Sequence, residues 1–136
     1  MKQFYLSGPM RGYPESNYPL FYEIEDALNF SDVEKDEPIE ILNPAQNFDG
    51  DPTLDLALYF SADLYMILAC DAVVLLPGWP DSEGSVLEVQ VSRMLGKEFW
   101  VAERNMDDLG WTFTQIDAGD LYAHARRARK LSYQTS

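Results

Sequence analysis

Hydrophobic and polar residues follow one another in blocks that predict alternating strands and helices. A continuous apolar run at residues 72–76 is typical of a strand covered on both faces, as in a parallel sheet packed between helices. The Pro- and Gly-rich residues 77–80 end this strand. A polar loop at 81–84 then leads into a helix whose apolar residues recur at helical spacing: Leu87, Val91, Met94 and Leu95. Ligands of open α/β sheets bind at such strand-to-helix junctions.

The same alternation predicts the other elements. Short β-like runs at residues 4–6, 39–42 and 98–102 predict three further strands. One helix is expected from about residue 17 or 18, and another over residues 54–69, with Thr53 as its N-cap. Gly96 is expected to end the helix that follows residue 84, in a left-handed conformation. The polar loop at 45–52 could fold over a ligand.

Beyond residue 102 the pattern is weaker. It predicts a short helix or loop around Trp111 and Phe113 and a basic helix over residues 121–131. Strands alternating with helices predict one α/β domain over residues 1–136, with a doubly wound parallel sheet of flavodoxin-like strand order.

The formal charge of −13 restricts the partners of this 136-residue chain. Nucleic-acid backbone and anionic membrane both need a basic surface, so neither is expected to bind. The charge fits a soluble protein, and it also fits an acidic interaction protein that mimics nucleic acid and occupies a basic partner. The chain shows no signal peptide and no apolar run of membrane-spanning length, which predicts a cytoplasmic location.

Two single residues bear on redox chemistry and metals. Cys70 is the only cysteine, lies among apolar neighbours, and is expected to be a small buried hydrophobe. His124 is the only histidine and is expected to be solvated in the basic C-terminal segment. One Cys and one His do not suggest a zinc site, so no metal is expected.

Two loops offer groups that bind anions. The first, at residues 7–12, combines glycines, which let backbone N–H groups approach a ligand, with Arg11, whose guanidinium forks onto phosphate or carboxylate. The second, at residues 82–85, presents hydroxyls and backbone amides at a helix start. A plain turn with a solvated arginine and an ordinary capping turn explain these two loops as well.

Two carboxylates are candidates for catalysis. Asp63 falls on the apolar stripe of its helix, and a buried carboxylate is costly unless it is bonded or functional: the stripe is Leu56, Phe60, Asp63 and Ile67. Glu88 lies just inside the helix after residue 84, where the helix dipole favours the ionised form that a nucleophile needs. Position alone also fits an ordinary acidic residue of a solvated first turn.

The order and spacing of several motifs resemble the nucleoside 2-deoxyribosyltransferase superfamily, and within it a small branch common in phages and prophages. The resemblance covers about residues 3–102 and leaves the C-terminal segment unmatched. The matching motifs are Tyr5-Leu-Ser-Gly-Pro-Met-Arg-Gly12, Asn17-x-Pro19-x-Phe21, Asp63 eight residues before Asp71, and Ser82-x-Gly84-x3-Glu88.

This resemblance implies an enzyme that cleaves the N-glycosidic bond of a nucleoside or nucleotide and passes the sugar to water or to another base. It places the nucleophile on Glu88, the proton-transferring carboxyl on Asp63, and on Tyr5 a phenol that holds Glu88. The intermediate would be a covalent glycosyl ester, as in retaining glycosidases. The superfamily needs no metal or other cofactor, and its members are homo-oligomers, dimers or larger.

One departure from the family pattern concerns the substrate. Transferases acting on free nucleosides carry an aspartate six residues before the nucleophile, where this chain has Ser82. Relatives that hydrolyse monophosphates carry a serine there and an arginine at the position of Arg11. A hydroxyl and a guanidinium bind phosphate, which a carboxylate would repel, so a 5′-monophosphate is the expected substrate. The expected substrate-binding residues are Ser7, Gly8, Arg11, Ser82, Gly84 and Ser85.

Two other functions stay open at this point. A catalytically idle module that holds a nucleotide or an ADP-ribose-like ligand would use the same loops without Glu88 as nucleophile. An acidic protein that blocks a host partner would account for the charge alone.

Overall fold

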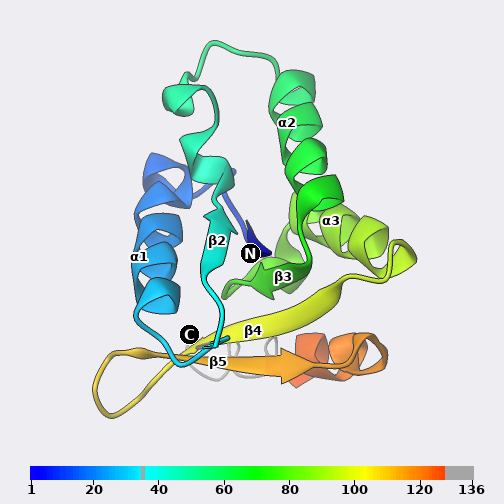
Figure 1. The fold of residues 1–136 in the computed structure, drawn as a ribbon. Helices are drawn as coiled ribbons and strands as arrows, with labels where there is room; N and C mark the ends of the chain where they lie inside the picture. The colour runs from blue at the N-terminus through cyan, green and yellow to red at the C-terminus, as the bar shows by residue number, and fades with distance from the viewer. Residues whose placement is uncertain (35, 128–136) are drawn as a thin grey trace.

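A five-stranded sheet, with helices on both faces, forms the centre of the computed structural model, which describes residues 1–34 and 36–127 (Figure 1). The strand order is β2-β1-β3-β4-β5. The strands are β1 (Lys2–Ser7), β2 (Ile39–Leu42), β3 (Ala72–Leu75), β4 (Glu98–Arg104) and β5 (Trp111–Ile116). The helices are α1 (Tyr18–Asn29), α2 (Leu56–Ala69), α3 (Glu83–Met94) and a further helical segment at residues 121–127.

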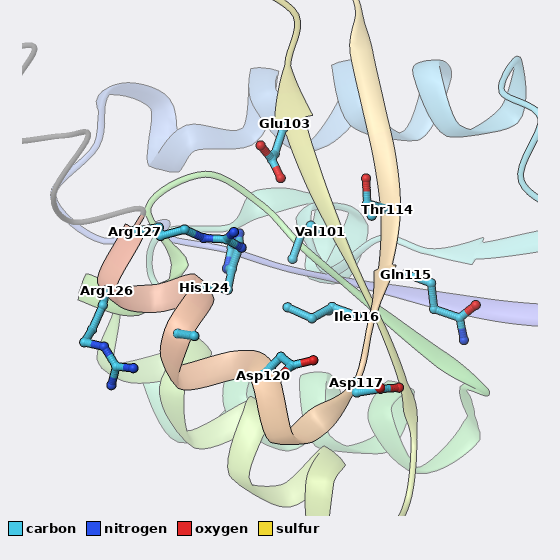
Figure 2. A pocket seen from close by; sticks show the side chains of 11 residues that line it. Val101, Glu103, Thr114, Gln115, Ile116, Asp117, Asp120, His124, Arg126 and Arg127 are labelled. Atoms are coloured by element: carbon cyan, nitrogen blue, oxygen red, sulfur yellow. The ribbon is translucent and has the colours of Figure 1, made fainter.

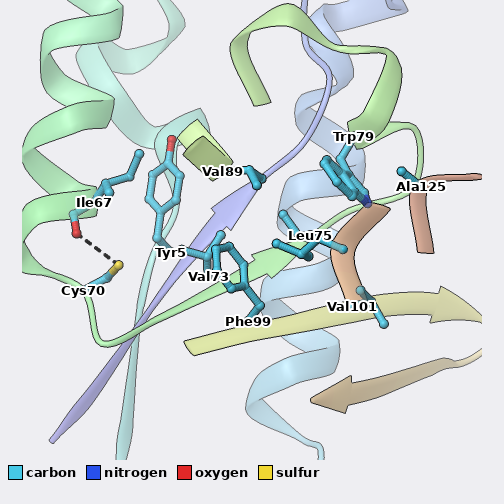
Figure 3. Packing of buried hydrophobic residues seen from close by; sticks show 11 residues of the cluster. Tyr5, Ile67, Cys70, Val73, Leu75, Trp79, Val89, Phe99, Val101 and Ala125 are labelled. Atoms are coloured by element: carbon cyan, nitrogen blue, oxygen red, sulfur yellow. Dashed lines mark hydrogen bonds between the residues drawn. The ribbon is translucent and has the colours of Figure 1, made fainter. Parts of the chain in front are cut away.

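The period of two along each strand separates the two cores. On β1, Phe4 and Leu6 point toward the helix α1, whose Phe21, Ile24 and Leu28 pack against them. Tyr5, one position out of phase, points to the opposite face, where α2, α3 and residues 121–127 pack. Figure 3 shows this second core, with Tyr5 and Ile67 at one end and Trp79 and Ala125 at the other.

The flavodoxin-like order predicted from the sequence is confirmed. Strands β1 to β4 are parallel, and β1 lies between β2 and β3. The chain therefore reverses its direction of travel across the sheet between β1 and β3, and the carboxyl ends of these two strands form the crevice where such folds bind ligands.

Trp111 and Phe113 lie on a strand, so the predicted short helix or loop there is wrong. Strand β5 pairs antiparallel with β4, from Phe99 opposite Ile116 to Arg104 opposite Trp111. Its residues alternate between apolar and polar, and both aromatic side chains pack on the α1 side of the sheet. The C-terminal region is therefore not merely helical or irregular. Of the basic helix predicted over 121–131, residues 128–131 lie outside the described part.

Two details of the helices also differ from the prediction. Asp55, not Thr53, caps α2, and its carboxylate accepts a hydrogen bond of 3.2 Å from the Ala57 N–H. On α3 the predicted apolar stripe is not the buried one, because Leu87 and Met94 are exposed. The inward face of α3 is mostly polar and consists of Ser85, Glu88, Val89 and Ser92. Gly96 has φ of +73°, and its predicted left-handed conformation is confirmed.

The loops that follow β1 and β3 lie side by side. The Leu76 N–H donates to the Ser7 carbonyl oxygen at 2.9 Å. A Cβ on Gly8 would come within 2.7 Å of the Leu76 Cβ, and one on Gly78 would come within 3.1 Å of Pro9. Gly8 is therefore needed for close packing between the two loops, whatever its contact with a ligand.

His124 is half-buried beside Trp79, which corrects the expectation that it is solvated. The Trp79 Nε1–H donates to His124 Nδ1 at 3.3 Å, and burial lowers the pKa of His124. This contact attaches the helical segment 121–127 to the loop after β3. Cys70 is buried at the end of α2, as expected. None of the helices in the described residues combines the length and apolar character that crossing a bilayer demands.

Candidate active site

Glu88 is a buried carboxylate held by two hydroxyl groups of β1. The Tyr5 hydroxyl donates to Glu88 Oε2 at 2.8 Å, and the Ser7 hydroxyl donates to Oε1 at 2.7 Å. Tyr5 and Ser7 are two residues apart on a strand, so both point to the face on which α3 packs. The side chain of Glu88 is nearly inaccessible, with its residue 5% exposed. The hydrogen bond between Tyr5 and Glu88 that the resemblance implied is thus present.

Asp63 approaches the same group from α2. Its helix is placed so that Ile67 is buried and Asp63 half-buried, as the apolar stripe predicted, although Leu56 at the start of the stripe is 53% exposed. A side-chain hydrogen bond links the carboxyls of Asp63 and Glu88. The Asn47 side-chain amide donates to Asp63 Oδ1 at 3.0 Å. Asn47 belongs to the short turn Pro44–Gly50, so the loop predicted to fold over a ligand contacts this carboxyl pair.

The two carboxyls have different proton affinities. Burial and the negative charge of Glu88 together raise the pKa of Asp63 to about 8, against the opposing effect of the hydrogen bond from Asn47. The pKa of Glu88 is raised to about 7, because burial outweighs the hydrogen bonds from Ser7, Tyr5 and Asp63, which lower it. Asp63 has the higher pKa, so when the pair holds a single proton that proton is favoured on Asp63, and Glu88 carries the charge. Such a pair provides one acid and one nucleophile.

The start of α3 lies one turn before Glu88. Ser82 is the N-cap, and its hydroxyl accepts a hydrogen bond of 3.3 Å from the Ser85 N–H. Ser85 is 1% exposed, and its Oγ has no hydrogen-bond partner within the described part of the chain. A buried hydroxyl without a partner is costly, and Ser85 is three residues before Glu88 on the same helical face. Gly84 and Arg11 are exposed.

A cavity of about 470 Å³ lies beside the turn that carries Asn47. Tyr18 of α1 lines it together with Tyr22, Ala45, Gln46, Asp49 and Gly50. Burial raises the pKa of Tyr18, and the negative charge of Asp63 raises it further.

A second cavity, of about 640 Å³, lies apart from Glu88. Figure 2 shows it between the ends of β4 and β5 and the segment 121–127, with Glu103 on the strand side and His124, Arg126 and Arg127 on the helical side. It shares no residue with the Glu88 group. This cavity is larger than the first, but Asp63 and Glu88 do not line it, so we do not take it as the active site. Among residues 1–34 and 36–127, no three His, Cys, Asp or Glu side chains are grouped as a metal site.

The sequence matches the family described as "Domain of unknown function (DUF4406)" over residues 2–101. The chain belongs to the DUF4406 family. The matched region contains the whole carboxyl group described above: Tyr5, Ser7, Asn47, Asp63 and Glu88. Among curated proteins, no sequence matches the chain.

The DUF4406 chain is similar in fold to the 2-desoxiribosyltransferase from Leishmania mexicana. The superposition has a TM-score of 0.55 and covers 82% of this chain and 79% of that one, at 17% sequence identity. At this identity the comparison shows a shared fold.

The sequence analysis predicted most residues of the cluster around Glu88, but it missed some of their contacts. Tyr5, Ser7, Asp63 and Glu88 come together, whereas Asn47 was unmarked within its polar loop. One signal could have indicated this turn: Asn43-Pro44 ends β2 at the same edge of the sheet as Ser7, where the site lies. Trp79 was also missed, because its contact with His124 joins segments 45 residues apart.

The raised pKa of Glu88 predicts how stability depends on pH. Its folded-state pKa, about 7, exceeds the ordinary 4.5, so the stability associated with its protonated form is lost as pH rises through about 7. Glu88→Gln removes the buried charge and should stabilise the fold at pH 8 by about 1–3 kcal/mol, with little gain at pH 4. Thermal unfolding of both proteins across this pH range measures the difference. Glu83→Gln, on the exposed side of α3, is the matched control and should give no such gain; equal behaviour of the two variants would contradict the assignment.

Proposed function

We propose that the chain cleaves the N-glycosidic bond of a nucleoside or nucleotide through a covalent glycosyl ester on Glu88. The observation that carries this proposal is a buried carboxylate whose oxygens are both fixed by hydroxyl donors, with a protonated carboxyl beside it. The shared fold with a deoxyribosyltransferase and the order of the sequence motifs support this proposal. Both also favour membership of the nucleoside 2-deoxyribosyltransferase superfamily.

The bond changes follow from the protonation states of the pair. An electron pair of the Glu88 carboxylate forms a bond to C1′ of the sugar as the bond from C1′ to the base nitrogen breaks. The base leaves with the electron pair of the broken C1′–N bond and accepts the proton of Asp63. Water or a second base then attacks C1′ from the vacated side, gives its proton to Asp63, and releases the Glu88 carboxylate. Two displacements give net retention at C1′.

The environment of the pair fits these roles. Tyr5 and Ser7 hold both oxygens of Glu88, so the direction of the nucleophile is fixed before the substrate binds. Asn47 holds Asp63 by a hydrogen bond and belongs to the turn that lines the 470 Å³ cavity. That cavity offers aromatic rings, Tyr18 and Tyr22, for stacking with a leaving base.

A nucleoside 5′-monophosphate is the substrate that the remaining groups favour. The N-terminus of α3, a position that favours anions, carries the Ser82 hydroxyl, and the buried Ser85 hydroxyl behind it has no hydrogen-bond partner within the described residues. The loop that carries Arg11 packs against the loop after β3 through Pro9 and Gly78. Asp81 and Glu83 flank Ser82 and oppose an anion, so the phosphate assignment needs its own test. Water and a second base are alternative acceptors that product analysis distinguishes.

Release of free base from a panel of deoxynucleoside and ribonucleoside monophosphates tests the proposal. Wild type should release base, and Glu88→Gln should lower the rate at least about a thousandfold while nucleotide binding, measured by calorimetry, is retained. Asp26→Asn, at an exposed position of α1, is the control and should keep the rate. If wild type binds nucleotides without releasing base, the chain is a binding module and the proposal fails.

The pKa values of the pair predict a bell-shaped dependence of kcat/KM on pH. Activity falls below about pH 7, where Glu88 gains a proton, and above about pH 8, where Asp63 loses one. Asp63→Asn keeps a hydrogen-bond donor but no acidic proton, so it should remove the alkaline limb and slow the reaction about a hundredfold or more. An unchanged alkaline limb in this variant would exclude Asp63 as the acid.

The phosphate assignment predicts a substrate-dependent effect of Arg11→Ala. Loss of a charge-assisted contact should raise KM for the monophosphate about tenfold to a hundredfold. The free deoxynucleoside has no phosphate to lose, so its KM should stay within about twofold. Steady-state kinetics with both substrates measure this. A preference of wild type for the free nucleoside, or equal weakening of both substrates, would assign Arg11 to loop ordering instead.

A further inference from the structure

The 640 Å³ cavity bordered by residues 121–127 has no part in the proposed function, and its lining carries charges of both signs. Arg126 and Arg127 line one side of it (Figure 2). Three carboxylates also line it: Glu103 on β4, and Asp117 and Asp120 between β5 and the helical segment. The two arginines belong to the basic C-terminal segment of a chain with 23 acidic and 10 basic residues. Positive charge, which is scarce in this chain, is therefore placed at this cavity.

The opposite charges around the cavity do not pair with each other. Within residues 1–34 and 36–127, neither arginine forms an ion pair with any of the three carboxylates. His124 is close to both signs of charge: burial lowers its pKa, the charge of Glu103 raises it, and that of Arg127 lowers it. A ligand with a single charge would neutralise one part of the lining and leave the other. A ligand with both an anionic and a cationic group complements both.

The cavity also borders the open edge of the sheet. Strand β5 is last in the strand order, and β4 is its one neighbour among the described strands. Four consecutive residues, 114–117, line the cavity. Because successive strand residues point to opposite faces, such a run indicates that the cavity reaches the backbone of β5 as well as one face. The open edge of a strand offers N–H and C=O groups with which an extended peptide can pair.

The volume and the lining select among ligands with both charges. The volume lies within the range of about 300–1,000 Å³ that is typical of small-molecule pockets, so the cavity holds more than an inorganic ion. Val101 and Ile116 add apolar side chains to the lining. A nucleotide would bring its phosphate charge to three carboxylates. A free amino acid carries both charges on one carbon atom, whereas a peptide separates them by about 3.3–3.6 Å for each extended residue.

We propose that this cavity binds a peptide of two or three residues with free termini. Its carboxylate binds Arg126 and Arg127, its amino group binds the carboxylates of the lining, and its backbone pairs with the open edge of β5. An apolar side chain of the peptide packs on Val101 and Ile116. The inference does not rest on the proposed function, because the cavity shares no residue with the cluster around Glu88.

Calorimetry with the tripeptide Gly-Leu-Gly tests the site. At pH 7 the amino group of the peptide, with a pKa of about 7.7–8.0, is largely charged. Wild type should bind this peptide. N-acetyl-Gly-Leu-Gly and Gly-Leu-Gly amide should each bind at least about tenfold more weakly, because each lacks one charge-assisted contact. No binding at about 5 mM peptide, or equal binding of either blocked peptide, would overturn the proposal.

His124 reports the location of the bound peptide, because it is the only histidine of the chain and lines the cavity. Gly-Leu-Gly should shift its imidazole NMR signals. Arg126→Gln/Arg127→Gln should weaken Gly-Leu-Gly about tenfold or more and leave the amide unchanged, since the amide has no carboxylate to lose. Arg93→Gln is the control, because Arg93 contacts the same segment through Tyr122 but does not line the cavity. Unshifted His124 signals on binding, or equal weakening by the double variant and the control, would overturn the location.

The other end of the peptide and its backbone are tested in the same way. Glu103→Gln/Asp120→Asn should weaken Gly-Leu-Gly but not its N-acetyl form, and Asp26→Asn on α1 is the control. Methylation of both amide nitrogens of Gly-Leu-Gly removes the N–H donors that would pair with β5 and should lower affinity about threefold or more. Melting curves establish that the variants fold. Equal affinity of the methylated peptide would overturn the pairing with β5, and equal weakening of both peptides by the acidic double variant would overturn the assignment of the amino group.

Discussion

Burial of the Glu88 carboxylate between β1 and α3 is the constraint on which the rest of the site depends. A carboxylate placed under a sheet is tolerated only where donors replace water, and Tyr5 and Ser7 supply them from adjacent inward positions of one strand. The parallel pairing of β1 with β3 brings the helix that follows β3 over that strand. The hydrogen bonds therefore fix the position of α3 relative to β1 as well as the direction of the carboxylate. The polar inner face of α3 follows from this, because Ser85, Glu88 and Ser92 occupy positions that a purely structural helix would give to apolar residues.

The sequence was sufficient for the parts of the fold that depend on local patterns. The uninterrupted apolar residues of β3 and the left-handed Gly96 each have a local physical cause. The fold class follows from the alternation of strands and helices along the chain. The inward face of α3 was not predictable in this way. Its apolar residues, Leu87 and Met94, lie on the outside, so periodicity alone selected the wrong face. Strand β5 was missed because its period of two is short and half-exposed, and its pairing with β4 depends on tertiary contacts such as the Trp111 Nε1–H bond to Glu23 Oε2.

More of the residue cluster around Glu88 than of the surrounding fold could be predicted from the sequence. Asp63 could be placed by the phase of its helix, and Glu88 and Tyr5 by a resemblance in motif order. Asn47 could not, because its partner is sixteen residues away across an irregular turn with positive φ at Phe48 and Asp49. Proton affinity was likewise outside the reach of the sequence. It depends on burial, which raises both pKa values, and on the number of donors, which is larger for Glu88 than for Asp63.

The two faces of α2 meet opposite physical demands. The inward face carries Asp63, whose buried carboxyl is stabilised when protonated and bonded, so this face is tied to the chemistry of the pair. The outward face carries no charge in a chain with 23 acidic and 10 basic residues. The position of Asp63 is set from the inward side, by the packing of Ile67 one turn later on α2 and by the hydrogen bond from Asn47. The turn that carries Asn47 and the sheet that buries Ile67 therefore place the acid together.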